Sequence, residues 1–388
     1  MKQYLTILVA LIALSVLAGC NGEDDGGGGS GGGGSTTIPD PGPRDPLPSN
    51  WVDLDYYFKP ELIKTGLNTP CKLDQAPDGR LSVSLLSGTI ITVLPTTPYT
   101  QVAWATLGVL NGSEQGLLGI AVSPNFTTDR YVYVVACINP GSGPRQQVIR
   151  YEEVGGVGTN PTVIVDNLPT ANIHNAGAIK FLSDGTFVVS VGDAANSTNS
   201  QTDGSLAGRI LRFDVNGNAP GNNPKSAPDQ FEWCRGLRNT FGLCIHPTTG
   251  TMLGVDNGPN SNDELNYLVA GKNYEWENAT GIPGAEIGVR LRNWPSVIVP
   301  TGITYHSGNN IPSGYANSLF ICSYDESKIL RFAMDGSPPV NIASEQTFAE
   351  LNNTGTANKP LDIIEGSDGS LYFTTFTEIW RVYRRTGP

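Results

Sequence analysis

The residue best suited to acid–base chemistry is His174, one of three histidines in the 388-residue chain. Histidine suits general-base catalysis because its unperturbed pKa lies near neutrality. An apolar segment (178–182), an Asp184-Gly185 turn and a second β-rich segment follow it, and Asp193 ends the series. Two consecutive strands of one blade would bring both residues to the same face, where a carboxylate that holds the ring would fix the imidazole tautomer. A structural histidine fits the same spacing, which leaves both interpretations open.

The other two histidines carry weaker signals. His246 lies in Ile245-His246-Pro247, just before a Thr-Gly turn, and is interpreted as a turn residue at a strand edge. His306, in Tyr305-His306-Ser307-Gly308, has no clear role from its neighbours.

The elements that must position these residues are strands. Helical patterns are nearly absent, and one unit recurs in which a turn precedes an alternating strand. Its six copies begin at Asp78-Gly79, Pro124-Asn125, Asp184-Gly185, Thr249-Gly250, Ser313-Gly314 and Asp368-Gly369. Each blade buries its faces only against its neighbours, so such units must close into a ring. The sequence therefore predicts an all-β fold, a six-bladed β-propeller of four-stranded antiparallel blades, over residues 51–388. Its long segments 192–224 and 256–300 are expected to carry function.

The N-terminus resembles a bacterial lipoprotein signal. Residues 1–20 contain a positive Lys2, an apolar run and Leu17-Ala18-Gly19-Cys20, which is similar to a lipobox with Cys20 as the lipidated residue. The alternative is an ordinary signal peptide with a chance cysteine. Residues 21–50 are rich in Gly, Ser and Pro and predict a tether, although the Gly/Ser repeat also fits an engineered scar. We expect an extracytoplasmic protein on the outer membrane, in the periplasm or on the cell surface, held to the membrane by its lipid anchor only.

Net charge and cysteine spacing argue against two classes of binding site, those for nucleic acid and those for zinc. A net charge of −12 argues against nucleic acid as a partner. Five cysteines remain besides Cys20, and their spacing fits no zinc motif. Disulfides are permitted outside the cytoplasm, but the pairing stays open, including a bond between Cys234 and Cys244.

Several ordered motifs resemble the glucose/sorbosone dehydrogenase family, which includes the soluble pyrroloquinoline quinone (PQQ) glucose dehydrogenases and the aldose sugar dehydrogenases. The resemblance covers roughly residues 60–385. The most specific stretch is Gly258-Pro259-Asn260-Ser261-Asn262-Asp263-Glu264 with Gly271-Lys272-Asn273-Tyr274. The weaker matches are Glu114-Gln115-Gly116-Leu117-Leu118-Gly119, His174-Asn175-Ala176-Gly177, Val191-Gly192-Asp193, Gly208-Arg209-Ile210-Leu211-Arg212 and Gly236-Leu237-Arg238-Asn239.

The resemblance implies roles for individual residues. His174 would be the general base at the sugar C1 hydroxyl, supported by Asp193, with Arg238 and Asn239 on the quinone. The Gly258 and Pro259 carbonyls would hold a calcium that also binds the quinone, since calcium prefers oxygen ligands. The further implied positions are Glu264 and the Tyr274 carbonyl for a second calcium, and Glu114 with Gln115 near the substrate. Arg238-Asn239 as a structural blade-edge pair, and the 258–264 loop as a calcium loop without quinone, are the simpler alternatives.

The main departure from the family pattern concerns the residues expected to bind the carboxylates of the quinone. His306 stands where the family has a cation for the quinone carboxylates, and Lys328, rather than Arg331, is the preferred replacement. Ile173 stands where some glucose-specific members have an acidic residue, and their long insertion is absent, which favours the broad aldose type.

The expected function is PQQ- and calcium-dependent oxidation of an aldose at C1 to its lactone, with electrons passed to a quinone or cytochrome. One alternative is a non-enzymatic cell-surface binding propeller, as in the related hedgehog-interacting-type proteins. A calcium-dependent lactonase-type hydrolase is the other, and it is disfavoured because the matching ligands are backbone carbonyls rather than acidic side chains.

Overall fold

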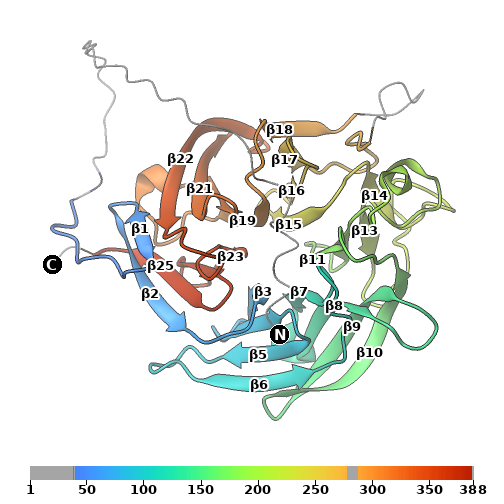
Figure 1. Cartoon of the computed structure of the whole chain (residues 1–388), viewed down its shortest axis with the longest axis horizontal. Coiled ribbons are helices and arrows are strands. Elements are labelled where there is room, and N and C mark those ends of the chain that lie inside the picture. Colours follow the sequence, from blue (N-terminus) through green and yellow to red (C-terminus); the bar gives the residue numbers. More distant parts are fainter. Residues whose placement is uncertain (1–37, 39, 278–286, 387–388) are drawn as a thin grey trace.

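Six antiparallel sheets surround a central axis in the computed structural model, which describes residues 38, 40–277 and 287–386 (Figure 1). Five of these sheets have four strands and one has five. The predicted six-bladed β-propeller of four-stranded antiparallel blades is confirmed, with one strand added to one blade.

The strands follow the blades in chain order. The first blade contains β3 (Pro70–Gln75), β4 (Leu81–Leu85), β5 (Thr89–Val93) and β6 (Gln101–Thr106). The second contains β7 (Leu117–Val122), β8 (Tyr131–Ile138), β9 (Arg145–Val154) and β10 (Val157–Leu168). The third contains β11 (Ala176–Phe181), β12 (Phe187–Val191), β13 (Arg209–Phe213) and β14 (Glu232–Arg235). The fourth contains β15 (Thr240–Ile245), β16 (Met252–Asp256), β17 (Asp263–Tyr267) and β18 (Val289–Trp294).

The last two blades include strands from the start of the domain. The fifth contains β19 (Pro300–His306), β20 (Ser318–Ser323), β21 (Lys328–Asp335), β22 (Asn341–Leu351) and the added β1 (Trp51–Leu54). The sixth contains β23 (Asp362–Glu365), β24 (Leu371–Thr374), β25 (Ile379–Arg384) and β2 (Phe58–Lys64). The helical elements described are α1 (Phe126–Asp129), η1 (Ser197–Gln201) and η2 (Ser313–Tyr315).

The six repeated units found in the sequence are the second strands of the blades, β4, β8, β12, β16, β20 and β24. These strands and their neighbours are packed on both faces, so β4, β7, β12, β16, β19 and β20 are buried at every position. A strand covered on both sides loses the alternation of a half-exposed strand. The turns before the second strands were therefore a clearer sequence signal than the strands themselves.

The ring is closed by pairing between the two ends of the domain. Strand β2 pairs with β25, so the sixth blade combines one early strand with the last three. The expected tether is partly attached as well, because Ile38 and Leu47 pack against the core of this region. The Arg385 guanidinium also donates to the Gly42 carbonyl at 2.6 Å. The contacts with the propeller thus begin before residue 51.

The innermost strands position the functional loops. Strands β3, β7, β11, β15, β19 and β23 line the axis and contact one another in turn (Figure 1). They run in the same direction, because each packs its early residues on those of the next, as Gly302 does on Asp362. The loops that precede these strands therefore meet at one edge of the ring, which is called here the entry edge.

Three further sequence expectations concern the cysteines, the N-terminal segment and the membrane. The five cysteines after Cys20 are all unpaired, so Cys234 and Cys244 form no disulfide. The signal segment 1–20 with Cys20, and most of the tether, lie outside the described residues. Among the residues that are described, no helix is long and apolar enough to cross a membrane.

Candidate active site

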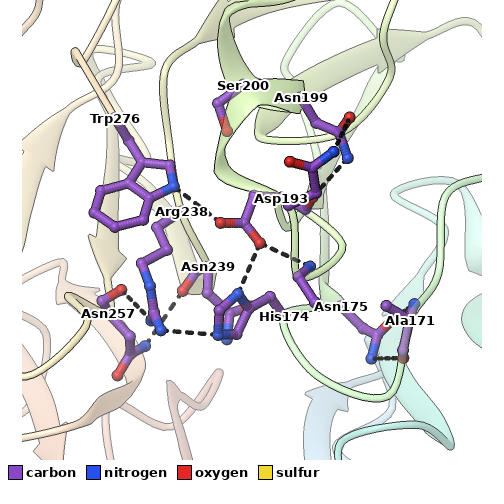
Figure 2. A network of polar contacts seen from close by, with 12 residues as sticks. Ala171, His174, Asn175, Asp193, Asn199, Ser200, Arg238, Asn239, Asn257 and Trp276 are labelled. Carbon is purple, nitrogen blue, oxygen red and sulfur yellow. Dashed lines mark hydrogen bonds and ion pairs between the residues drawn. The ribbon is translucent and has the colours of Figure 1, made fainter. Parts of the chain in front are cut away.

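His174, Asp193 and Arg238 meet at the entry edge, although they come from three separate loops (Figure 2). The imidazole Nδ1 lies 2.7 Å from Asp193 Oδ1, and Nε2 lies 2.8 Å from an Arg238 guanidinium nitrogen. His174 precedes β11, Asp193 follows β12 and Arg238 precedes β15. The structure thus brings together the three residues expected to be catalytic.

These contacts define the tautomer of His174. A guanidinium has only donors, so Nε2 accepts its hydrogen bond and Nδ1 carries the proton donated to Asp193. The side chain of His174 is 12% exposed and that of Asp193 is 2% exposed. The unprotonated Nε2 therefore faces the Arg238 guanidinium, while the Asp193 carboxylate holds the Nδ1–H.

Asp193 is itself fixed by further donors. Oδ1 also accepts the Ala195 amide at 2.9 Å, and Oδ2 accepts the indole N–H of Trp276 at 2.9 Å. The Trp276 ring also lies 5.5 Å from the Arg238 guanidinium (Figure 2). The sequence reasoning missed this residue, because its only signal was its place two residues after the Gly271-Lys272-Asn273-Tyr274 motif.

Backbone hydrogen bonds fix the positions of the three loops relative to one another. The Asp193 amide donates to the Arg238 carbonyl at 2.8 Å, and the Ala194 amide donates to the His174 carbonyl at 3.3 Å. His174 has a positive φ of 59°. A Cβ at Gly192 would meet the His174 carbonyl oxygen at 2.1 Å, so only glycine leaves room for this approach.

A buried carboxylate, Asp256, positions Arg238 and Asn239. It accepts the backbone amides of both residues, at 2.9 and 2.7 Å. The Asn239 side chain reaches the neighbouring loop, where its oxygen accepts the Ala176 amide at 3.1 Å. Asp256 was another omission from the predicted site, since its role depends on contacts between strands.

Glu114 joins the site from the second blade. One of its oxygens accepts the His174 amide at 2.6 Å and the Asn239 side-chain amide at 3.4 Å. Burial raises the pKa of Glu114 above its usual value, against the effect of these donors. Gln115 is turned away, and its amide lies 3.4 Å from the Thr170 hydroxyl in the loop that leads to His174.

The expected calcium ligands of the quinone site lie beside Arg238. Its guanidinium donates to the carbonyls of Asn257 and Gly258, at 2.8 and 3.0 Å. The side-chain oxygen of Asn257 is buried without a hydrogen-bond partner. Pro259 is exposed in the same turn. This set of neutral oxygens fits calcium, provided that Arg238 releases the Gly258 carbonyl.

The expected second calcium site is filled by a side chain. Glu264 and the Tyr274 carbonyl are brought together, but both contact the Arg290 guanidinium, at 2.9 Å each. Burial and the Asp256 carboxylate raise the pKa of Glu264 to about 7. The Arg290 guanidinium thus lies between the two residues that the resemblance assigned to a second calcium ion.

The expected cofactor contact of His306 does not fit its position. Strand β19 begins at Pro300, whose carbonyl accepts the Asn257 side chain at 3.1 Å at the entry edge. His306 ends that strand at the opposite edge, where its Nε2 lies 3.0 Å from the Gly369 carbonyl and Nδ1 accepts the Gly308 amide at 3.0 Å. Both ring nitrogens are satisfied within the protein, so we assign His306 a structural role.

The candidate cations are placed differently from one another. Lys328 begins β21 and pairs with Ser323 at the entry edge, whereas Arg331 donates to Ser318 at 2.8 Å further along the strand. Lys359, which the sequence reasoning did not select, also lies at the entry edge. Its amino group donates to the Tyr324 and Asp325 carbonyls at 3.1 and 2.8 Å. Lys328 and Lys359 therefore lie on the same edge of the ring as Arg238.

The turn role predicted for His246 is confirmed. Its Nδ1 accepts the Thr248 and Thr249 amides, at 3.2 and 3.1 Å. Of the three histidines, His174 alone belongs to the cluster at the entry edge.

Comparison with known proteins decides the family. The sequence profile described as Glucose / Sorbosone dehydrogenase matches residues 67–384, which is most of the chain. The chain belongs to the glucose/sorbosone dehydrogenase family. The resemblance that the motifs predicted is thereby confirmed.

Individual relatives agree with membership of the glucose/sorbosone dehydrogenase family. The chain is 27% identical to the uncharacterized protein slr1608 of Synechocystis over 370 residues, which cover 84% of this chain and 87% of the relative. It is 27% identical to quinoprotein glucose dehydrogenase B of Acinetobacter calcoaceticus over 255 residues, covering 58% and 53%. The PQQ-bound structure of aldose sugar dehydrogenase from Streptomyces coelicolor superposes with a TM-score of 0.71 at 26% identity, covering 85% of this chain and 99% of the other.

Proposed function

We propose that this protein is a PQQ- and calcium-dependent sugar dehydrogenase that oxidises an aldose at C1 to its lactone. One observation carries the proposal: the His174 imidazole presents an unprotonated Nε2 at the entry edge while Asp193 holds its Nδ1–H. This arrangement suits a general base, because the carboxylate stabilises the imidazolium that forms.

The base acts on the C1 hydroxyl of the sugar. In the present arrangement Nε2 accepts from Arg238, so a substrate hydroxyl must replace the guanidinium at that nitrogen. The proton then passes from the hydroxyl to Nε2, while Trp276 and Ala195 keep Asp193 in place through the transfer. Glu114 helps to position the base by accepting a hydrogen bond from the His174 backbone amide.

The chain offers residues that fit the cofactor and its metal. PQQ, when bound, supplies the two-electron acceptor for the hydride that leaves C1. Arg238 and Asn239 would hold it and stabilise charge on its oxygens, with Lys328 and Lys359 as candidates for its carboxylates. The Gly258 and Pro259 carbonyls would hold calcium, and the unpartnered oxygen of Asn257 is a further donor beside them.

The His306 departure does not weigh against cofactor binding. His306 lies at the opposite edge, where it bonds the Gly369 carbonyl, so its identity does not favour a binding propeller without quinone. The sugar substrate follows from the family and from relatives named as sugar dehydrogenases. We propose a broad aldose specificity, with a quinone or cytochrome as the final electron acceptor.

Reconstitution tests this function. Purified protein is loaded with calcium and PQQ and assayed with a panel of aldoses and an artificial electron acceptor. We expect the quinone absorbance to change on binding, dye reduction with at least one aldose, and loss of both when a chelator is added before PQQ. Unchanged quinone absorbance together with no sugar oxidation would favour the binding propeller instead.

We also propose that Cys20 carries a lipid and that the propeller acts outside the cytoplasm. The signal-like segment 1–20 and the Gly/Ser-rich segment after it motivate this proposal. Detergent phase partitioning of the full chain expressed in a bacterium tests it, with Cys20→Ser as the comparison. The wild type should enter the detergent phase and the variant should not; equal partitioning into water would contradict the anchor.

A further inference from the structure

A cluster of oxygens surrounds the Arg290 guanidinium at the outer part of the fourth blade. Nε lies 2.9 Å from Glu264 Oε1, and a terminal nitrogen donates to the Tyr274 carbonyl at 2.9 Å. The same terminal nitrogen lies 3.5 Å from Glu275 Oε2. One side chain on β18 therefore joins β17 to the segment 274–275.

The oxygens of this cluster need a positive partner. The Glu264 and Glu275 side chains are only 15% and 16% exposed, so water screens their charges poorly. The Asn266 amide donates to the second oxygen of Glu264 at 3.1 Å, but it brings no charge. Two carboxylates and a carbonyl would suit calcium, which prefers several hard oxygens.

We propose that Arg290 takes the place of the second calcium ion, so that this part of the blade is held together without a metal. A guanidinium presents several donors in one plane and can contact three oxygens at once, whereas an ammonium is a compact point charge. Two of the three residues that Arg290 contacts, Glu264 and Tyr274, are those that would otherwise bind the ion.

The arrangement also reaches the active site. Tyr274 and Glu275 immediately precede Trp276, whose indole donates to Asp193. A fixed guanidinium in this position holds the Trp276 segment at any calcium concentration. The inference does not rest on the proposed enzyme function, because it concerns calcium binding and stability only.

The test compares Arg290→Ala with Arg292→Ala in the full chain. Arg292 lies on the same strand with a similar exposure, 40% against 39%, and pairs with Glu345 instead. Calcium is titrated calorimetrically into chelator-treated protein without PQQ, and Tm is measured with calcium and with chelator. We expect Arg290→Ala to bind one calcium more than the wild type, and to lose about 2–4 °C in chelator that calcium restores. Arg292→Ala should bind as many ions as the wild type.

A second variant keeps the test decisive if Arg290→Ala does not fold. In Glu264→Gln the amide oxygen still accepts from Arg290, but the charge that a calcium ion would need is gone. The proposal predicts that this variant and the wild type bind the same number of calcium ions. One ion fewer in Glu264→Gln, or no additional ion in a folded Arg290→Ala, would overturn it.

Discussion

The Trp276 indole N–H donates to Asp193 at 2.9 Å, on the carboxylate oxygen that His174 does not use. The carboxylate that orients the base is thus oriented in turn by a residue from the next blade. Arg238 lies between these groups, with its guanidinium 5.5 Å from the Trp276 ring and 2.8 Å from His174 Nε2. The base, the carboxylate, the indole and the guanidinium therefore form one connected unit. Replacing any one of them is expected to impair the function of the others.

Trp276→Phe removes the indole donor and keeps most of the ring. A hydrogen bond to a charged group contributes about 1.5–3 kcal/mol, so kcat should fall roughly tenfold or more. Trp233→Phe is the control, since its indole donates to the Leu268 carbonyl outside the site. A Trp276→Phe enzyme that keeps the wild-type kcat would show that the hydrogen bond from the indole to Asp193 does not support catalysis.

Gly192→Ala places a methyl group against the His174 carbonyl, 2.1 Å from its oxygen. The backbone must move, and displacement of a catalytic group by about 1 Å can cost about 100-fold in rate. We expect kcat/KM to fall by about that factor. Gly221→Ala is the matched control, because a Cβ at Gly221 would meet nothing within 4 Å. Equal activity of the two variants would contradict the close contact between Gly192 and the His174 carbonyl.

Glu114→Gln tests a pH dependence of stability. Burial raises the folded-state pKa of Glu114 above its unfolded value of about 4.3. The folded state therefore holds the Glu114 proton more tightly than the unfolded state does. The stability that this proton contributes is fully present below the unfolded pKa and is lost as pH rises through the folded pKa. Glutamine keeps an acceptor for the His174 amide without the charge. The stability of Glu114→Gln relative to wild type, from urea unfolding, should therefore increase between pH 4 and pH 7. A constant difference across this range would contradict the burial argument.

The sequence predicted the six blades of the ring, but it did not predict which strands pair to close it. Turns such as Asp184-Gly185 mark the second strand of each blade because a tight turn needs particular residues locally. The pairing of β2 with β25 joins residues more than 300 positions apart and leaves no local signal. The added strand β1 was missed for the same reason.

The site was predicted where family motifs carried it and missed where contacts between blades decide it. His174, Asp193, Arg238 and Asn239 lie together, whereas Trp276 acts through a loop contact that spacing cannot show. His306 was misplaced because its motif gives no strand direction, and direction decides which edge a residue faces.

The most direct test of the central claim is turnover by His174→Ala loaded with calcium and PQQ. His246→Asn is the control, because the amide oxygen can replace Nδ1 as the acceptor in that turn. The account predicts that both variants bind the quinone, seen in its absorbance. Aldose oxidation should fall by about 10²–10⁴-fold in His174→Ala alone, the usual contribution of a general base. Sugar oxidation at the wild-type rate by a folded, quinone-loaded His174→Ala would contradict the assignment of His174 as the base.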